Sequence, residues 1–137
     1  MSPEENKAIV RRYLEEAWNQ RNLGIFDELM DSNYARYLSG QPSPLDREGA
    51  KQRIASFHQA LPDLHLTIED LVAEGDKVVC RNIWRWTDSS SKKMQFHGFV
   101  LWRFEGDKIA ERWATVTPPS EGASWAAAPR LAGTRAS

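Results

Sequence analysis

The sequence predicts an α+β domain, because helix-type patterns fill its first half and strand-type patterns fill its second. In the 137-residue chain, large apolar residues recur every three or four positions before Pro62 and at every second position from Leu64. Two alternating runs flank a Gly-Asp turn at residues 105–108, an arrangement typical of a β-hairpin. Three helices followed by four strands predict an antiparallel sheet that curls around the helices.

Three helices are expected, over residues 2–18, 23–30 and 46–61. The first begins with Ser2 as its N-cap and Pro3 in its first turn, and Glu5 completes a capping box. Asp46 caps the third helix, and Pro62 ends it. Each helix carries an apolar stripe, which predicts that all three pack on the sheet.

Four strands are expected, over residues 64–69, 78–87, 95–104 and 109–116, with a shorter extended segment at 34–38. The tetrapeptide Glu-Gly-Asp-Lys occurs at 74–77 and at 105–108, both times between strands, which indicates repeated turn chemistry. The run 95–104 is apolar on both alternating faces. Such a strand needs helices or a cavity against one face and another surface, often a second subunit, against the other.

Composition and charge restrict the classes of function. The formal charge of −1 makes nucleic acid and anionic membranes unsuitable partners. Cys80 is the single cysteine, so an internal disulfide and a multi-cysteine zinc site are excluded, and a buried thiol is expected. No apolar run reaches the ~18 residues of a membrane span, and the acidic start does not resemble a signal peptide, so a cytoplasmic protein is the default expectation.

Residues 1–117 are expected to form one domain, and residues 118–137 a tail. After Pro118 and Pro119 the composition shifts to Ala, Gly, Pro and Ser, which predicts a disordered or loosely docked segment. Six tryptophans exceed what a core of this size requires. Several of them are therefore expected to line a cavity or an interface.

Four short motifs occur in a fixed order between residues 5 and 117. They are the segment 6–12 running into Trp18-Asn19, the triplet Arg47-Glu48-Gly49, the segment 61–64 before 68–70, and the segment 103–113. In this order the chain resembles the SnoaL-like polyketide cyclases of the NTF2-like superfamily. The resemblance implies a cone-shaped barrel of three N-terminal helices on a curved, mainly antiparallel sheet, with an apolar pocket. It also implies a homodimer through the outer face of the sheet.

The chemistry that the resemblance implies is an intramolecular aldol closure of a polyketide ester without a cofactor. An acid/base group on the last strand removes a proton, and the enolate then attacks a carbonyl. The family's inward His and Asp on this strand correspond to Arg112 and Ala114 here. On the neighbouring strand Gly98 and Val100 stand where the family has Gln and His, and Tyr37 replaces a frequent His. The cyclase machinery is therefore missing, and no catalytic residue is assigned.

Arg112 is the sharpest candidate for ligand binding. If it shares the inward face with Ala114 and Val116, it places a positive charge in an aromatic cavity, suited to a carboxylate, phosphate or enolate oxygen. The alternative is that Arg112 pairs with an acid or reaches solvent at the barrel mouth. Tyr13 and Tyr37 are expected to offer hydroxyls to a ligand, although Tyr13 also suits core packing. The expected aromatic lining, in which each residue equally suits an ordinary core, is Trp18, Trp84, Trp86 and Trp102.

The histidines and the remaining polar residues are assigned no chemistry. His97 has the parity of Phe99 and Leu101 and is expected at the dimer face, although a one-residue bulge would turn it into the pocket. His58 and His65 are expected at exposed positions without a specific role. Neither metal ligands nor a cofactor are expected, because the three histidines are not spaced as metal ligands and no carboxylate cluster joins them.

Two functions from different classes remain open. One is a cofactor-free cyclase or isomerase of the polyketide cyclase or ketosteroid isomerase type, acting on a small carbonyl compound with a relocated acid/base. The other is a non-catalytic module that binds a small apolar or anionic molecule through the aromatic pocket and Arg112. A dimerisation domain with a filled core is a third, weaker alternative.

Overall fold

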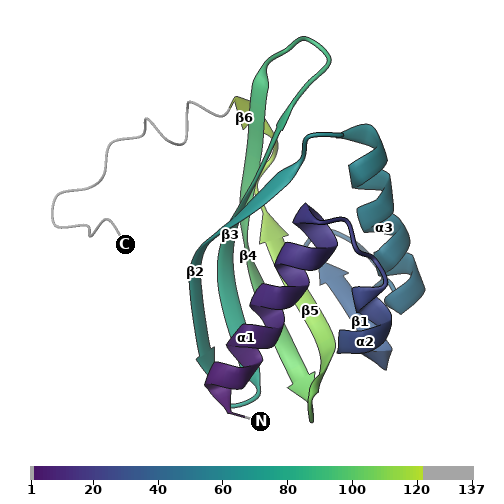
Figure 1. Ribbon diagram of the computed structural model, residues 1–137, viewed down its shortest axis with the longest axis vertical. Helices are drawn as coiled ribbons and strands as arrows, with labels where there is room; N and C mark the ends of the chain where they lie inside the picture. The colour runs from purple at the N-terminus through teal and green to yellow at the C-terminus, as the bar shows by residue number, and fades with distance from the viewer. Residues whose placement is uncertain (1, 122–137) are drawn as a thin grey trace, which may run out of the picture.

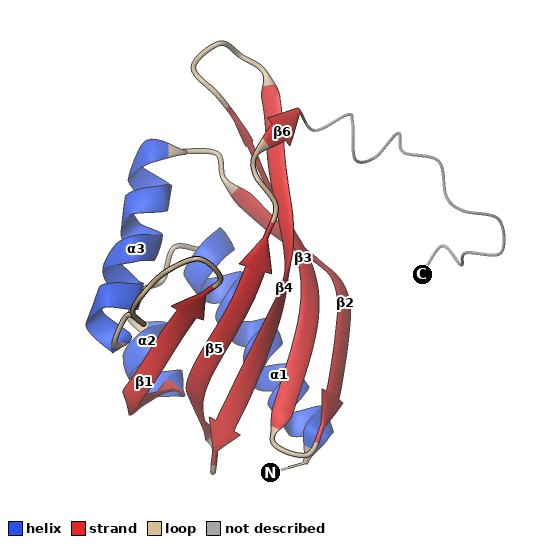
Figure 2. Ribbon diagram, turned by 180° about the vertical axis from the view of Figure 1, so that it is seen from behind, coloured by secondary structure: helices blue, strands red, loops and turns tan. Residues whose placement is uncertain are grey.

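The computed structural model describes residues 2–121, in which helices cover one face of a curved sheet (Figure 1). From the opposite side the strands lie uncovered by helices, as Figure 2 shows. In chain order the elements are α1 (Pro3–Tyr13), the π-helical turn η1 (Leu14–Asn19), α2 (Ile25–Leu29), β1 (Met30–Leu38), α3 (Arg47–Ala60), β2 (His65–Glu74), β3 (Lys77–Thr87), β4 (Lys93–Glu105), β5 (Lys108–Val116) and β6 (Ser120–Glu121). The predicted α+β class with three N-terminal helices on a curved sheet is confirmed, but the sheet does not close into a barrel. The space between the helices and the concave face of the sheet is called the cone below.

The sheet is open, with strand order β1-β5-β4-β3-β2 and the short β6 paired to the start of β4. β1 runs parallel to β5, and the other strand pairs are antiparallel. Register shifts interrupt β2 between Ile68 and Asp70 and β4 between Arg103 and Phe104. Such bulges bend strands and increase their twist, which fits the curvature of this sheet around the helices.

The predicted helix starts are confirmed atom by atom. Ser2 Oγ accepts a hydrogen bond from Glu5 N at 3.1 Å, and Glu5 Oε1 accepts one from Ser2 N at 3.0 Å, completing the capping box. Asp46 Oδ1 accepts from Gly49 N at 2.7 Å at the start of α3. Both turns of the Glu-Gly-Asp-Lys type carry their glycine at positive φ, 61° at Gly75 and 59° at Gly106.

Two helix ends differ from the expectation. The first helix changes after Tyr13 into the π-helical turn, where Gln20 N donates to Glu15 O at 3.0 Å across five residues. Trp18 is buried in this turn. The second helix ends at Leu29, because Met30 already begins β1 and the strand is longer than the extended segment expected at 34–38.

Inward-facing side chains alternate with outward-facing ones along β3, β4 and β5, so the sheet has a core face and an outer face. The core face packs under the helices, and Gly98 lies on it where β4 approaches β5. A Cβ atom at Gly98 would lie 2.5 Å from Thr115 O and 2.7 Å from Val116 Cγ1. The close approach of the two strands therefore requires glycine at this position.

The outer face exposes large apolar side chains, and no helix of the described residues covers it. Its large hydrophobic residues Val72, Phe99 and Trp113 are 61%, 60% and 47% exposed. Two cross-strand ion pairs lie on the same face, Arg81 with Asp70 at 2.7 Å and Arg103 with Glu111 at 2.9 Å. The expectation that a second subunit covers this face stays a prediction.

The sheet extends beyond the predicted domain boundary at residue 117. In β6, Ser120 pairs with Gln95 and Glu121 pairs with Met94. The rest of the predicted tail, residues 122–137, lies outside the described residues. Within the part that the structure describes, no helix combines the length and the apolar character that a membrane span needs.

Candidate functional site: an arginine-lined cavity inside the cone

A small cavity lies between the helices and the core face of the sheet, with a volume of about 60 Å³. Ligand pockets typically measure roughly 300–1,000 Å³, so side chains fill most of the interior. The lining residues come from η1, β1, α3, β3, β4 and β5, and they are Trp18, Arg36, Leu38, Arg53, Phe57, Trp84, Phe96, Arg112 and Val116. Aromatic rings and arginines dominate this lining.

Arg112 and Arg36 lie directly opposite each other in the parallel pairing of β5 with β1. Both side chains turn inward, and the residues are 4% and 8% exposed. Within residues 2–121 neither guanidinium forms an ion pair or a side-chain hydrogen bond, and Arg112 Nη1 is buried without a partner. Two buried positive charges thus face the cavity without the carboxylate that normally compensates a buried arginine.

The electrostatic consequence is a lowered pKa for both groups. Burial, reinforced by the neighbouring charge of Arg112, lowers the pKa of Arg36 to about 10. Burial also lowers the pKa of Arg112, and its guanidinium carbon lies 5.9 Å from the ring centroid of Trp102. Arginine keeps its charge in proteins, so the cavity holds two cations.

Two tyrosines accompany the arginine pair. The Tyr34 hydroxyl is buried and has no hydrogen-bond partner in the described part of the chain, and burial raises the pKa of Tyr34 to about 12. Tyr13 is also buried, which raises its pKa, and its ring meets Trp102 edge-on at 5.2 Å and Phe26 at 5.4 Å. Tyr13 therefore packs in the core behind the arginines and does not line the cavity, whereas Tyr34 adds a neutral donor close to them.

The predicted tryptophans occupy three different environments. Trp18 and Trp84 line the cavity and meet edge-on at 5.9 Å, and Trp84 stacks on Phe96 at 4.7 Å. Trp102 lies buried in the core and donates from Nε1 to the Cys80 sulfur at 3.5 Å. Trp86 contacts Phe96 edge-on at 5.6 Å but borders a separate cleft at the end of the sheet.

Tyr37 lies on the other side of the sheet from Arg112. It opposes Trp113 in the parallel register, and the two rings stack with centroids 3.8 Å apart and planes 5° apart. Because side chains alternate along β1, the interior positions go to Tyr34, Arg36 and Leu38. The structure thus brings Arg36, which the sequence reasoning missed, to the place expected for Tyr37.

Sequence reasoning also missed Arg53. This exposed residue of α3 lies four positions before Phe57, so both side chains reach the same edge of the cavity. The alternation within 34–38 groups Tyr34 with Arg36, but the segment alone does not show which of its faces is turned inward. The parallel pairing with β5 determines which face is turned inward, and no pattern within the segment predicts this pairing.

Acid/base candidates lie away from the cavity. Among the described residues, no histidine or carboxylate lines it, and no group of histidine, cysteine and acidic side chains is arranged to hold a metal ion. His58, expected at an exposed position, is buried and its Nε2 donates to Trp18 O at 2.9 Å. His97 lies on the outer face with Phe99, as expected from its parity, and Asn82 is fully buried on the core face.

Helices over one face of a curved sheet, enclosing an aromatic interior, define a protein of the NTF2-like type. The family model described as SnoaL-like polyketide cyclase matches residues 8–116. The chain therefore belongs to the SnoaL-like polyketide cyclase family. No curated protein matches the chain at a significant level.

Solved structures share the fold over most of the chain. A candidate polyketide cyclase from Acidithiobacillus ferrooxidans is 26% identical, with a TM-score of 0.73 and coverage of 85% of this chain and 91% of that one. AclR, a candidate hydroxylase from Streptomyces galilaeus, is 21% identical, with a TM-score of 0.74 and coverage of 85% and 91%. An LEH-like epoxide hydrolase from M. tuberculosis is 12% identical, with a TM-score of 0.69 and coverage of 84% of both chains. Proteins described with three different activities thus share this scaffold, so the site must decide the chemistry.

Proposed function

We propose that this protein binds a small, mostly apolar molecule with an anionic group, which Arg112 and Arg36 hold inside the cone. The single observation that carries the proposal is the pair of buried guanidinium groups without a carboxylate partner. A buried charge that lacks compensation costs several kcal/mol in general terms. An anion would form charge-assisted hydrogen bonds with both groups and offset that cost.

The shape of the cavity restricts where the ligand lies. A free volume of about 60 Å³ admits a carboxylate-sized group. Arg53 is exposed and marks the edge of the cavity where α3 borders it, with Phe57 beside it. The anionic group of the ligand is accordingly assigned to the arginine pair, and its apolar part to the rings of Trp18, Phe57 and Phe96.

Binding is favoured over the family's aldol closure because no general base is found among the described residues that line the cavity. Ala114 stands where the resemblance implies a carboxylate, and protonated arginines cannot accept a proton at neutral pH. The second candidate is a cofactor-free cyclase or isomerase in which Arg112 and the Tyr34 hydroxyl stabilise an enolate. It is supported by family membership and by these two unpartnered donors, and it needs a base that the ligand or another residue provides.

Benzoate and benzyl alcohol form a matched pair of probes, equal in their ring and different in charge. At constant ionic strength, benzoate is expected to raise the melting temperature of the protein, whereas benzyl alcohol is not. Arg112→Met and Arg36→Met are each expected to weaken benzoate binding at least tenfold, as the loss of a charge-assisted hydrogen bond predicts. Equal stabilisation by both probes, or unchanged benzoate affinity in both variants, would contradict the proposal.

A further inference from the structure

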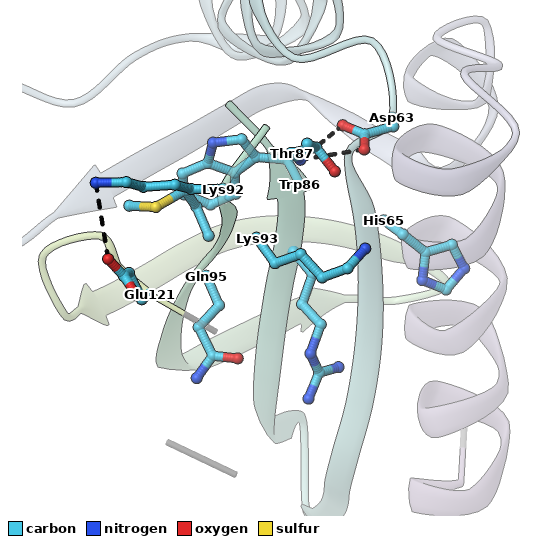
Figure 3. Close-up of a pocket in the computed structure, with 10 residues that line it drawn as sticks. Asp63, His65, Trp86, Thr87, Lys92, Lys93, Gln95 and Glu121 are labelled. Atoms are coloured by element: carbon cyan, nitrogen blue, oxygen red, sulfur yellow. Dashed lines mark hydrogen bonds and ion pairs between the residues drawn. The ribbon is translucent and has the colours of Figure 1, made fainter. Parts of the chain in front are cut away.

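A second cleft, separate from the arginine-lined cavity, lies where β6 pairs with the start of β4 (Figure 3). It has a volume of about 500 Å³, within the usual range of small-molecule sites. The residues that line it include His65, Arg85, Trp86, Lys93 and Gln95. We propose that this cleft binds a small hydroxylated organic anion, such as a phosphate monoester that carries a free hydroxyl group.

The first support is a row of polar side chains across the sheet. In the strand pairing, His65 of β2 opposes Arg85 of β3, and Arg85 opposes Gln95 of β4. Residues directly opposite in antiparallel strands project from the same face, with their Cβ atoms about 5 Å apart. The imidazole, guanidinium and amide therefore lie side by side on the outer face.

The second support is Gln95 itself. It is fully buried, and neither its Oε1 nor its Nε2 has a hydrogen-bond partner among the described residues. A buried amide without partners is destabilising, because both groups have lost their hydrogen bonds to water. Gln95 also lines the cleft, so a ligand there can accept from Nε2 and donate a hydroxyl hydrogen to Oε1 once the buried amide turns toward the cleft.

The third support is the charge of the lining. Arg85 and Lys93 are exposed and form no ion pair within residues 2–121. The two carboxylates of the cleft are already engaged. Asp63 accepts from Thr87 N at 3.0 and 3.1 Å, and Glu121 lies 3.8 Å from Lys92 Nζ. Figure 3 shows these two interactions on either side of the cleft. The lining holds three cations, Arg85, Lys92 and Lys93, and two carboxylates, so one net positive charge attracts an anion.

The proposal assigns each part of the ligand. The anionic group lies between Arg85 and Lys93, the hydroxyl group bonds Gln95, and Trp86 provides an apolar wall. His65 lies next to Arg85 in the row and borders the anionic group. The cone is not involved, so this site and the arginine-lined cavity can be tested separately.

Glycerol 3-phosphate is the probe, with inorganic phosphate and glycerol as its two parts. In an NMR titration of the full chain, glycerol 3-phosphate is expected to shift the side-chain amide signals of Gln95 and to bind more tightly than inorganic phosphate. Arg85→Gln is expected to weaken binding about tenfold, whereas Lys77→Gln, at the opposite end of β3, and Arg112→Met leave it unchanged. Gln95→Leu is expected to weaken binding while the melting temperature stays level or rises, because it removes an unsatisfied buried amide.

Three outcomes would overturn the proposal. The first is the absence of any shift at Gln95 with millimolar glycerol 3-phosphate. The second is equal weakening by Arg85→Gln and Lys77→Gln, which would indicate charge attraction without a site. The third is a Gln95 signal that depends on protein concentration and not on the probe, which would assign this cleft to a contact between two copies of the chain.

Discussion

At the scale of single residues, Arg112 links the fold to the proposed function. It fills a core position with a charge that no described group neutralises, and it has a buried unpartnered nitrogen. We predict that Arg112→Met, similar in length and uncharged, leaves the free energy of unfolding unchanged or raises it by roughly 1–4 kcal/mol, while anion binding is lost. Urea denaturation without added anion measures this. A loss of more than about 2 kcal/mol would mean that Arg112 has a structural partner, since breaking a buried pair is strongly destabilising.

A second prediction at this scale concerns pH. Burial lowers the pKa of His58 below its ordinary value of 6.5, although the bond to the Trp18 carbonyl opposes the shift. The unfolded chain therefore binds the proton more readily than the folded one, and stability falls as pH decreases below about 6.5. His58→Gln is expected to flatten this part of the stability profile in urea denaturation between pH 5 and 8. An identical pH profile in the variant would show that another group titrates there.

At the scale of elements, the sequence predicted the features that depend on a few neighbouring residues and missed those that depend on distant ones. Caps, turns and alternation lie within a few residues, so Ser2, Asp46, Gly75 and Gly106 could be placed in advance. The π-helical turn could not, because its apolar spacing also fits the end of an α-helix.

The inward face of β1 was beyond prediction for a different reason. The pairing of Arg36 with Arg112 joins segments more than seventy residues apart in a parallel register. A shift of one residue would exchange Tyr37 for Arg36 on the core face. The candidate site was therefore predicted in part: Arg112, Trp18 and Trp84 line the cavity, whereas Arg36 and Arg53 emerged only from the tertiary structure.

The approach of β4 to β5 makes a prediction about Gly98. A methyl group there would press on the backbone of Thr115, which cannot move aside without disturbing the strand pairing. Gly98→Ala is expected to lower the free energy of unfolding by about 1–3 kcal/mol, as overpacking does. Gly24→Ala serves as the matched control, because its φ is −62° and the nearest atom, Asn22 Oδ1, lies 3.3 Å away. Equal stability of both variants in denaturant titration would contradict the account of this strand pair.

At the scale of the whole molecule, the outer face predicts self-association. Val72, Phe99 and Trp113 expose large apolar side chains on the face that the helices leave uncovered. We predict a homodimer through this face, which Phe99→Glu converts to a monomer by placing a charge in an apolar interface. Sedimentation equilibrium measures the change, and Ala8→Glu, at an exposed position of α1, is the control. A monomeric wild-type protein at about 100 μM would contradict the prediction.

A second point at the scale of the whole molecule is that the fold and the chemistry of the site differ in how closely they follow the family. The chain belongs to the SnoaL-like polyketide cyclase family over residues 8–116, while Arg112 and Ala114 stand where the resemblance implies a His and an Asp. The proposed change from proton transfer to anion binding would explain why the fold was readable from sequence and the function was not. The fold is specified by many apolar residues along the chain, whereas the proposed anion binding depends on two side chains, Arg112 and Arg36.

The most direct measurement is a crystal structure of the protein with 4-bromobenzoate, in which anomalous scattering locates the bromine. We expect the carboxylate to lie within about 3 Å of guanidinium nitrogens of Arg112 and Arg36. The ring is expected to lie among Trp18, Phe57 and Phe96. Bromine sites only outside the cone, with both guanidinium groups still without an anion, would contradict this expectation.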